Sequence, residues 1–186
     1  MVALMRARHA AVLFSACAIV WGAFSPVPKA HAANLVITQS TSFPPGEYFF
    51  DSLTVASSST LTLLGNPAAS STFKGVIIHA QDLTVESGSS ISANGKGYGA
   101  NQGPGASSLY YAGASYGGTG ASNTETSAPT YGSALEPVDL GSGGAAYGGG
   151  AMQLLVTDTF TNNGTVSANG GASASGGSIL VAAGKF

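Results

Sequence analysis

Charged side chains are scarce in this chain of 186 residues, because Asp, Glu, Lys and Arg together make up only 8% of it. Cysteine occurs once and histidine three times, whereas glycine occurs 27 times. Residues that favour helices are also few. This composition suits one domain that is rich in turns and poor in helix.

The first 32 residues are organised like a secretory signal peptide. A start with two arginines leads into an apolar run at 10–24, and an Ala-His-Ala pattern ends at Ala32. Such a run is too short for a confident membrane span, and the small residues fit the site that a signal peptidase cuts after. We therefore expect residues 1–32 to be removed and residues 33–186 to be secreted or carried at the cell surface, which in a Gram-negative organism means the periplasm or the outer surface.

Cys17 leaves an alternative open. The segment Phe14-Ser15-Ala16-Cys17 loosely resembles a bacterial lipobox, in which the cysteine would be acylated and would hold the protein on a membrane. The secreted form is favoured, because the apolar run continues past Cys17, where a lipobox should close it. After cleavage at Ala32 the chain has no cysteine, so its stability must come from packing and not from disulfides.

Removal of the first 32 residues also removes both arginines of the chain. Only Lys74, Lys96 and Lys185 remain against eight acids, which leaves a net charge of about −5. Three scattered lysines form no basic patch that could neutralise phosphates. We therefore expect no nucleic-acid partner, no anionic membrane surface and no transmembrane span in the mature chain.

Alternation of apolar and small polar residues predicts strands. Residues 52–65 recur at 82–95, and residues 75–95 recur at 150–170, where both copies end in Ser-Ala-Asn-Gly. In the second comparison the phase slips, so that Leu83 pairs with Phe160, and we expect the compensating insertions at turns. The side chains predicted to point inward are Leu53, Val55, Leu83, Val85, Phe160 and Val166.

A repeat of this length cannot bury its own apolar face, so its recurrence predicts an all-β solenoid of stacked coils. The coils are expected at 46–65, 75–95, 150–170 and, as a partial coil, 176–186. In the partial coil, Gly176 to Val181 echoes Gly150 to Leu155. The chain therefore resembles a solenoid cut off within a coil, whose last strand offers an open edge for self-association.

The longest segment without a strand pattern spans residues 96–149. We interpret it as an excursion from one corner of a coil that builds no core of its own. Its tyrosines could stack on sugar rings or on a protein partner, or could pin a glycine-rich loop to the coil, and both interpretations stay open. The six candidate contact residues are Tyr98, Tyr110, Tyr111, Tyr116, Tyr131 and Tyr147.

Four segments together resemble the coils of a known architecture. They are Gly75 to Ile78, Leu83 to Gly88, Ser92 to Gly95 and Ser175 to Ile179. They look like coils of bacterial secreted right-handed parallel β-helix proteins, the pectin-lyase-like architecture that also serves surface and adhesin-like proteins. The resemblance covers about residues 46–186 and implies a right-handed parallel β-helix, although only about three coils are visible where the family usually stacks many.

Candidate catalytic residues are few. Enzymes that resemble this architecture use a basic group with carboxylates that often hold calcium, but residues 33–186 contain no arginine and no adjacent acids. Stacking could bring Asp51 near Asp82 as a carboxylate pair. His79 is the only histidine after cleavage and lacks the partners of a zinc site. We therefore assign no catalytic, metal or cofactor residue.

Two short patterns have ordinary explanations. Gly95-Lys96-Gly97 lacks the further residues of a phosphate-binding loop, so its glycines are assigned to tight turns. The row Thr157-x-Thr159-x-Thr161 is typical of an ice-binding face, which needs such a row in coil after coil. Because the aligned positions hold Gln81 or Asp82 and then Leu83 or Thr84, we interpret these residues as exposed strand threonines.

The sequence thus predicts an exported β-helix module with a structural, adhesive or attachment role and without catalysis. Its expected partner is a glycan or a surface protein. The alternative is a carbohydrate-active enzyme, a polysaccharide lyase or hydrolase, or the N-terminal fragment of one. Clustered Asp or Arg in further downstream sequence would favour the enzyme.

Overall fold

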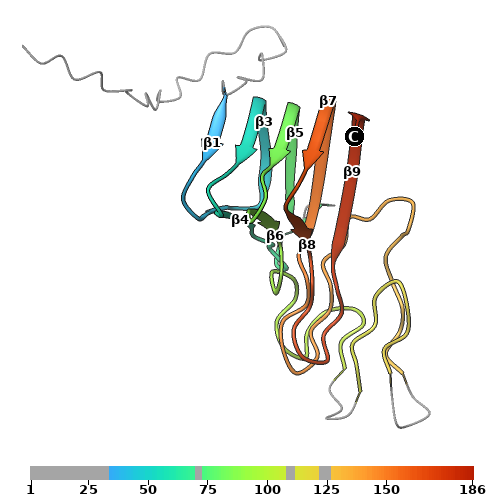
Figure 1. The fold of residues 1–186 in the computed structure, drawn as a ribbon. Helices are drawn as coiled ribbons and strands as arrows, with labels where there is room; N and C mark the ends of the chain where they lie inside the picture. Colours follow the sequence, from blue (N-terminus) through green and yellow to red (C-terminus); the bar gives the residue numbers. More distant parts are fainter. Residues whose placement is uncertain (1–33, 70–72, 108–111, 122–126) are drawn as a thin grey trace, which may run out of the picture.

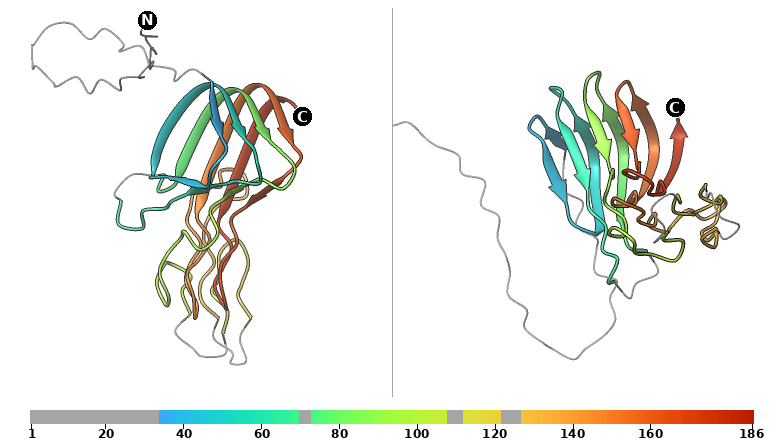
Figure 2. Two further views of the ribbon diagram at one scale, coloured as in Figure 1. Left: turned by 60° about the vertical axis from the view of Figure 1, so that its left-hand side comes forward. Right: turned by 90° about the horizontal axis from the view of Figure 1, so that it is seen from below.

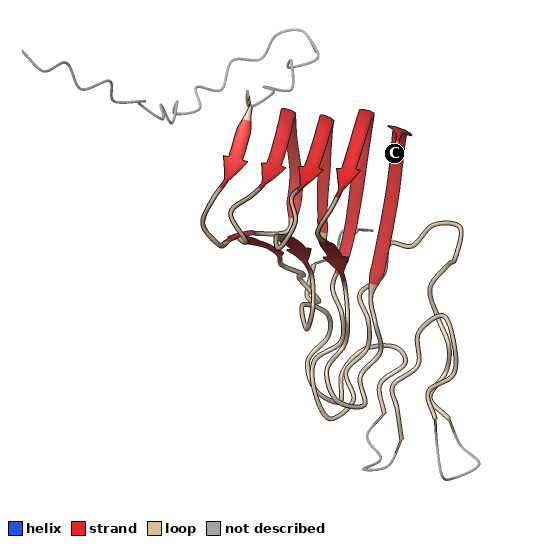
Figure 3. Cartoon of the chain, viewed as in Figure 1, coloured by secondary structure: helices blue, strands red, loops and turns tan. Residues whose placement is uncertain are grey.

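The structure is a computed structural model that describes residues 34–69, 73–107, 112–121 and 127–186. It contains strands and no helix in this part of the chain (Figure 3). The strands are β1 (Leu35–Ile37), β2 (Thr41–Phe43), β3 (Gly46–Val55), β4 (Thr60–Leu63), β5 (Val76–Val85), β6 (Ser90–Ser92), β7 (Ala151–Asn162), β8 (Thr165–Ser167) and β9 (Ser178–Lys185). The predicted signal peptide and Cys17 lie outside the described residues.

The strands form two parallel sheets, so the predicted all-β class is confirmed (Figure 1). The five-stranded sheet has the order β1-β3-β5-β7-β9, and the four-stranded sheet has the order β2-β4-β6-β8. Successive strands therefore alternate between the sheets, and each strand pairs with the strand two places further along the chain. This arrangement gives a hydrophobic layer between the sheets at every pass of the chain.

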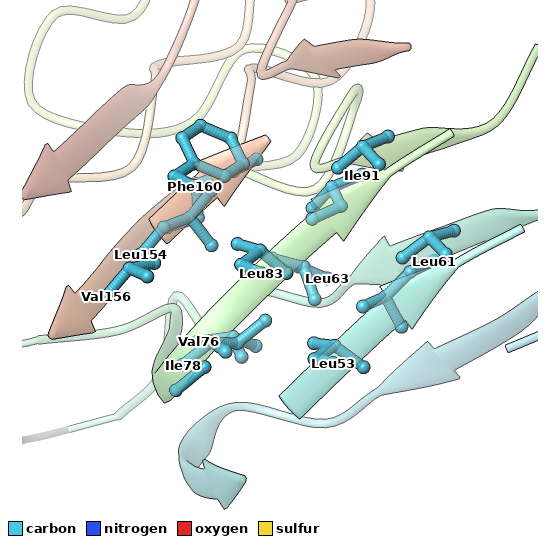
Figure 4. Close-up of a cluster of buried hydrophobic side chains, with 14 of the residues drawn as sticks. Leu53, Leu61, Leu63, Val76, Ile78, Leu83, Ile91, Leu154, Val156 and Phe160 are labelled. Carbon is cyan, nitrogen blue, oxygen red and sulfur yellow. The ribbon is translucent and has the colours of Figure 1, made fainter. Parts of the chain in front are cut away.

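The core consists of the side chains that the alternation places on the inner faces (Figure 4). Leu53, Val55, Leu83 and Val85 are fully buried, Phe160 is buried, and Val166 packs against the same cluster while partly exposed. The predicted inward set is therefore confirmed. In a strand, neighbouring side chains point to opposite faces, so the spacing of apolar residues alone determines the buried face.

The register agrees with the repeats at most positions. Leu53 lies beside Leu83, and Leu83 beside Phe160, as predicted. One insertion was expected at a turn but lies within a strand, because β7 has one residue more than β5 between the pairs that precede and follow it. A β-bulge accommodates such an extra residue inside a ladder.

The last strand deviates from the predicted register by one residue. The echo places Ser178 opposite Met152, whereas the ladder pairs Met152 with Ile179 and Leu154 with Val181. A shift by one residue exchanges the two faces of a strand. Ile179 and Val181 therefore continue the inner rows, and Ser178 faces the other way.

The glycine-rich segments are residues 96–149 and the connection at 168–177 between β8 and β9. Their described parts extend away from the sheets as long loops that run side by side (Figure 2). They are joined by backbone hydrogen bonds outside the sheets, such as those from Gly97 N to Gly148 O at 2.7 Å and from Gly149 N to Ser175 O at 3.0 Å. Leu140 within the segment 96–149 is 1% exposed. The segment is therefore more closely joined to the rest of the described chain than its lack of an apolar pattern predicts.

Candidate functional site

Two of the candidate tyrosines anchor the glycine-rich segment. The rings of Tyr116 and Tyr131 meet edge to face with centroids 4.8 Å apart. The hydroxyl of Tyr131 donates to the Leu140 carbonyl at 2.6 Å, and that of Tyr116 contacts the Ser178 hydroxyl at the start of β9. Their hydroxyls are thus engaged within the protein, which favours the pinning role for these two residues.

Burial changes the acidity of both anchors. Desolvation raises the pKa of Tyr131 to about 12 and raises the pKa of Tyr116 as well, because a phenolate is disfavoured away from water. Hydrogen bonds with Ser142 and Ser178 oppose the increase at Tyr131 and Tyr116, respectively. Both rings therefore remain neutral anchors at physiological pH.

Buried serines complete this anchoring cluster, and sequence analysis did not single them out. The Ser142 hydroxyl donates to the Tyr131 oxygen at 2.8 Å and accepts from Gly105 N at 2.9 Å. The backbone N–H of Ser142 donates to the Ser175 hydroxyl at 2.7 Å. Serine is common in every turn of this chain, so no local pattern marks the buried ones.

Tyr98 lies beside a lysine. The Lys74 ammonium donates to the Tyr98 hydroxyl and to the Pro67 carbonyl, both at 3.2 Å, and lies 5.5 Å from the centre of the Tyr98 ring. These contacts of Lys74 join the loop that contains Pro67 to Tyr98. Two further candidate tyrosines, Tyr110 and Tyr111, lie outside the described residues.

Tyr147 differs from the anchors because it is 59% exposed. It lines a shallow groove of about 620 Å³ together with Lys96, Gln102 and several glycines. Its backbone is held in place, since Gly171 N donates to the Tyr147 carbonyl at 2.9 Å. The groove thus combines an aromatic face with an ammonium and an amide, and Lys96 is the one charged residue among the described residues that line it.

Gly99 lies beside both Tyr147 and Gln102 in this groove. A Cβ atom at Gly99 would lie 3.8 Å from Cε1 of Tyr147 and 3.1 Å from Oε1 of Gln102. A Cβ at Gly99 would therefore be in ordinary contact with the ring and would crowd the Gln102 amide. We define Tyr147, Lys96 and Gln102 as the Tyr147 groove, which is the candidate functional site.

In the described part of the chain, Asp82 of β5 pairs with Ser52 of β3, the residue that follows Asp51, so the two candidate acids lie on neighbouring strands. No group of three or more His, Cys, Asp or Glu there could hold a metal ion. Asp82 accepts a hydrogen bond from Thr159 N at 3.3 Å. His79 stacks on Phe49 with ring centres 4.4 Å apart, and its Nε2 lies 3.6 Å from Oε2 of Glu47. His79 therefore contacts the neighbouring strand β3.

Comparison of the chain with protein-family models, curated proteins and solved structures found no match. Among the described residues, none forms a helix that is both long and apolar enough to cross a membrane.

Proposed function

We propose that residues 33–186 form an exported right-handed parallel β-helix that serves as an attachment module at the cell surface or outside the cell. The alternation of parallel strands between two sheets, with one inner row continuing from strand to strand, supports a coiled path. The N-terminal signal-like sequence supports export. In this proposal the coils are a rigid support, and the glycine-rich segment carries the binding site.

The ligand that fits the Tyr147 groove best is a glycan. A sugar ring has an apolar face that stacks on an aromatic ring, and its hydroxyls need donors and acceptors such as an amide and an ammonium. The exposed ring of Tyr147 beside Lys96 and Gln102 is the observation that carries the proposal. A shallow, solvent-exposed groove buries little of a ligand, so weak binding strengthened by several copies is expected.

The test is a glycan array followed by titration of the best glycan. Replacing Tyr147 with Ala should weaken binding by about fivefold or more, because a stacking contact is worth roughly 1 kcal/mol or more. The matched control is Leu135→Ala, which also removes an exposed apolar side chain, 93% exposed, away from the groove. Circular dichroism should show both variants folded.

Two results would contradict this function. Binding that is equally strong in wild type and in Tyr147→Ala would exclude the groove. Cleavage of a glycan that is lost in Asp51→Asn or Asp82→Asn would instead support the alternative of a carbohydrate-active enzyme.

A further inference from the structure

One face of the four-stranded sheet carries an ordered array of hydroxyl groups. On β4, β6 and β8 the inner positions are apolar, as at Leu61 and Ile91, whereas the edge strand β2 has Thr41 beside Leu61. The alternate positions on the outer face of all four strands are serine or threonine. The register aligns them in two ladders across the strands. The first ladder is Ser42, Thr62, Ser92 and Ser167, and the second is Thr60, Ser90 and Thr165.

The array is regular because the backbone beneath it is regular. Neighbours within a ladder are about 4.8 Å apart, and the two ladders are about 6.6 Å apart along the strands. The hydroxyls of Thr60 and Ser90 lie 2.9 Å apart in a hydrogen bond, and Thr60 N donates to the Ser40 hydroxyl at 3.0 Å. Threonine is also restricted at χ1, so its hydroxyl and methyl groups hold fixed positions.

A third ladder of the same kind lies on the five-stranded sheet, at the ends of its strands. Thr54 pairs with Thr84, and Thr84 pairs with Thr161. Thr161 belongs to the row Thr157-x-Thr159-x-Thr161, and the sequence left open whether Leu83 or Thr84 aligns with it. The register pairs Thr84 with Thr161. One column of the threonine row therefore does recur from strand to strand.

The composition of the face restricts what it could bind. β2, β4, β6 and β8 contain no charged residue, so the face offers no partner to an ionic ligand. Its aromatic residue, Phe43, packs toward the core, so no outward ring on these strands can stack on a sugar. What remains is a neutral, rigid lattice of hydroxyl and methyl groups, about 14 Å across the strands.

We propose that this hydroxyl array binds the surface of ice. A crystal face of ice presents only water molecules at fixed intervals, which a neutral array of fixed hydroxyls can join by hydrogen bonds while the threonine methyls contact the spaces between them. Hydroxyls that are already held by the sheet lose little entropy on binding, as in other preorganised sites. The array is separate from Tyr147, so this inference does not depend on the proposed glycan function.

The test measures inhibition of ice recrystallisation, and thermal hysteresis, by the purified secreted protein. The wild type should inhibit recrystallisation. Thr62→Lys and Ser92→Lys each place a long charged side chain in the centre of the array and should raise the concentration needed for inhibition by about tenfold or more. The matched control is Gln81→Lys, which adds the same charge at an exposed position of β5 outside the array.

If a central variant fails to fold, Ser42→Lys on the exposed edge strand tests the same ladder. Tyr147→Ala should leave the effect on ice unchanged. A folded wild type without effect on ice would overturn the inference. Equal activity of wild type and all array variants would also overturn it. So would a wild type that binds crystalline cellulose and has no effect on ice, if Thr62→Lys abolishes the binding to cellulose.

Discussion

The tyrosines of this chain have different environments although their sequence neighbourhoods are alike. Tyr131 and Tyr116 have hydroxyls bonded to Leu140 and Ser178, whereas Tyr147 projects from the surface. A buried hydroxyl stabilises only while its partners remain, and losing one partner leaves the other group unsatisfied. The anchors should therefore affect stability, and Tyr147 should affect binding.

Alkaline pH should test the Tyr131 anchor. Since its folded pKa of about 12 lies above the ordinary value near 10, the folded protein keeps a proton that the unfolded chain releases between these values. Its contribution to stability is thus complete below about pH 10 and is lost as the pH rises toward about 12. Urea unfolding at several pH values should show this decline.

Tyr131→Phe should reduce that alkaline decline and should also lower stability at neutral pH by about 1–3 kcal/mol, because the Leu140 carbonyl loses its donor. Tyr147→Phe, which changes an exposed residue, is the control. An unchanged alkaline decline in Tyr131→Phe would contradict the assignment.

A matched pair on β5 tests the two faces of the strand. Val85 is fully buried, and its neighbour Thr84 lies in the outer ladder. Val85→Asp should abolish folding or cost several kcal/mol, because it buries an unpaired charge, whereas Thr84→Asp should be tolerated. Circular dichroism and thermal unfolding measure the difference, and equal tolerance of both changes would refute the assigned faces.

The glycine-rich segments form an element of their own kind. Their backbones pass so closely that side chains are excluded at several crossings: a Cβ atom at Gly141 would lie 2.3 Å from the Gly176 carbonyl oxygen. Hydrogen bonds such as Gly141 N to Gly149 O at 2.8 Å join them outside the sheets. Glycine here permits close packing of backbones, which differs from its usual role in turns.

Two glycine substitutions should separate these roles. Gly141→Ala should destabilise the glycine-rich element strongly, because the methyl group would overlap a backbone oxygen that cannot move independently. Gly117→Ala should have little effect, since a Cβ atom there meets nothing within 4 Å. Limited proteolysis and hydrogen exchange of residues 96–149 should report the difference, and similar protection in both variants would contradict this account.

At the scale of the whole molecule, the four-stranded sheet ends at β8 and the five-stranded sheet ends at β9. Its Ile179 is 38% exposed although the register places it in an inner row, and β9 is the last strand of its sheet. A strand edge with free backbone groups and apolar side chains is a template for pairing with another chain. We therefore propose self-association through β9.

Sedimentation velocity over a range of protein concentrations tests this association. The wild type should associate at high concentration, and Ala182→Lys should reduce association because a lysine on an edge strand opposes pairing. Gln81→Lys adds the same charge on an internal strand and should associate like the wild type. A protein that stays monomeric throughout would exclude the β9 contact.

The sequence by itself determined the strands and their buried faces. Alternation at Leu53, Thr54 and Val55 predicts which side chains point inward, because side-chain direction in a strand depends on local geometry. The repeat likewise predicts that Leu53 lies beside Leu83, because neighbouring parallel strands with similar sequences bury their apolar rows best in register.

Only the tertiary structure decided where the strand registers shift and which tyrosines are anchored. The bulge in β7 and the one-residue shift at Ile179 depend on how neighbouring strands fit, which the alternation within one strand does not record. Tyr131 is an anchor and Tyr147 is exposed because of backbone and serine contacts between different segments of the chain. Such contacts need no apolar period, so glycine-rich sequences with very different packing look alike until the chain is folded.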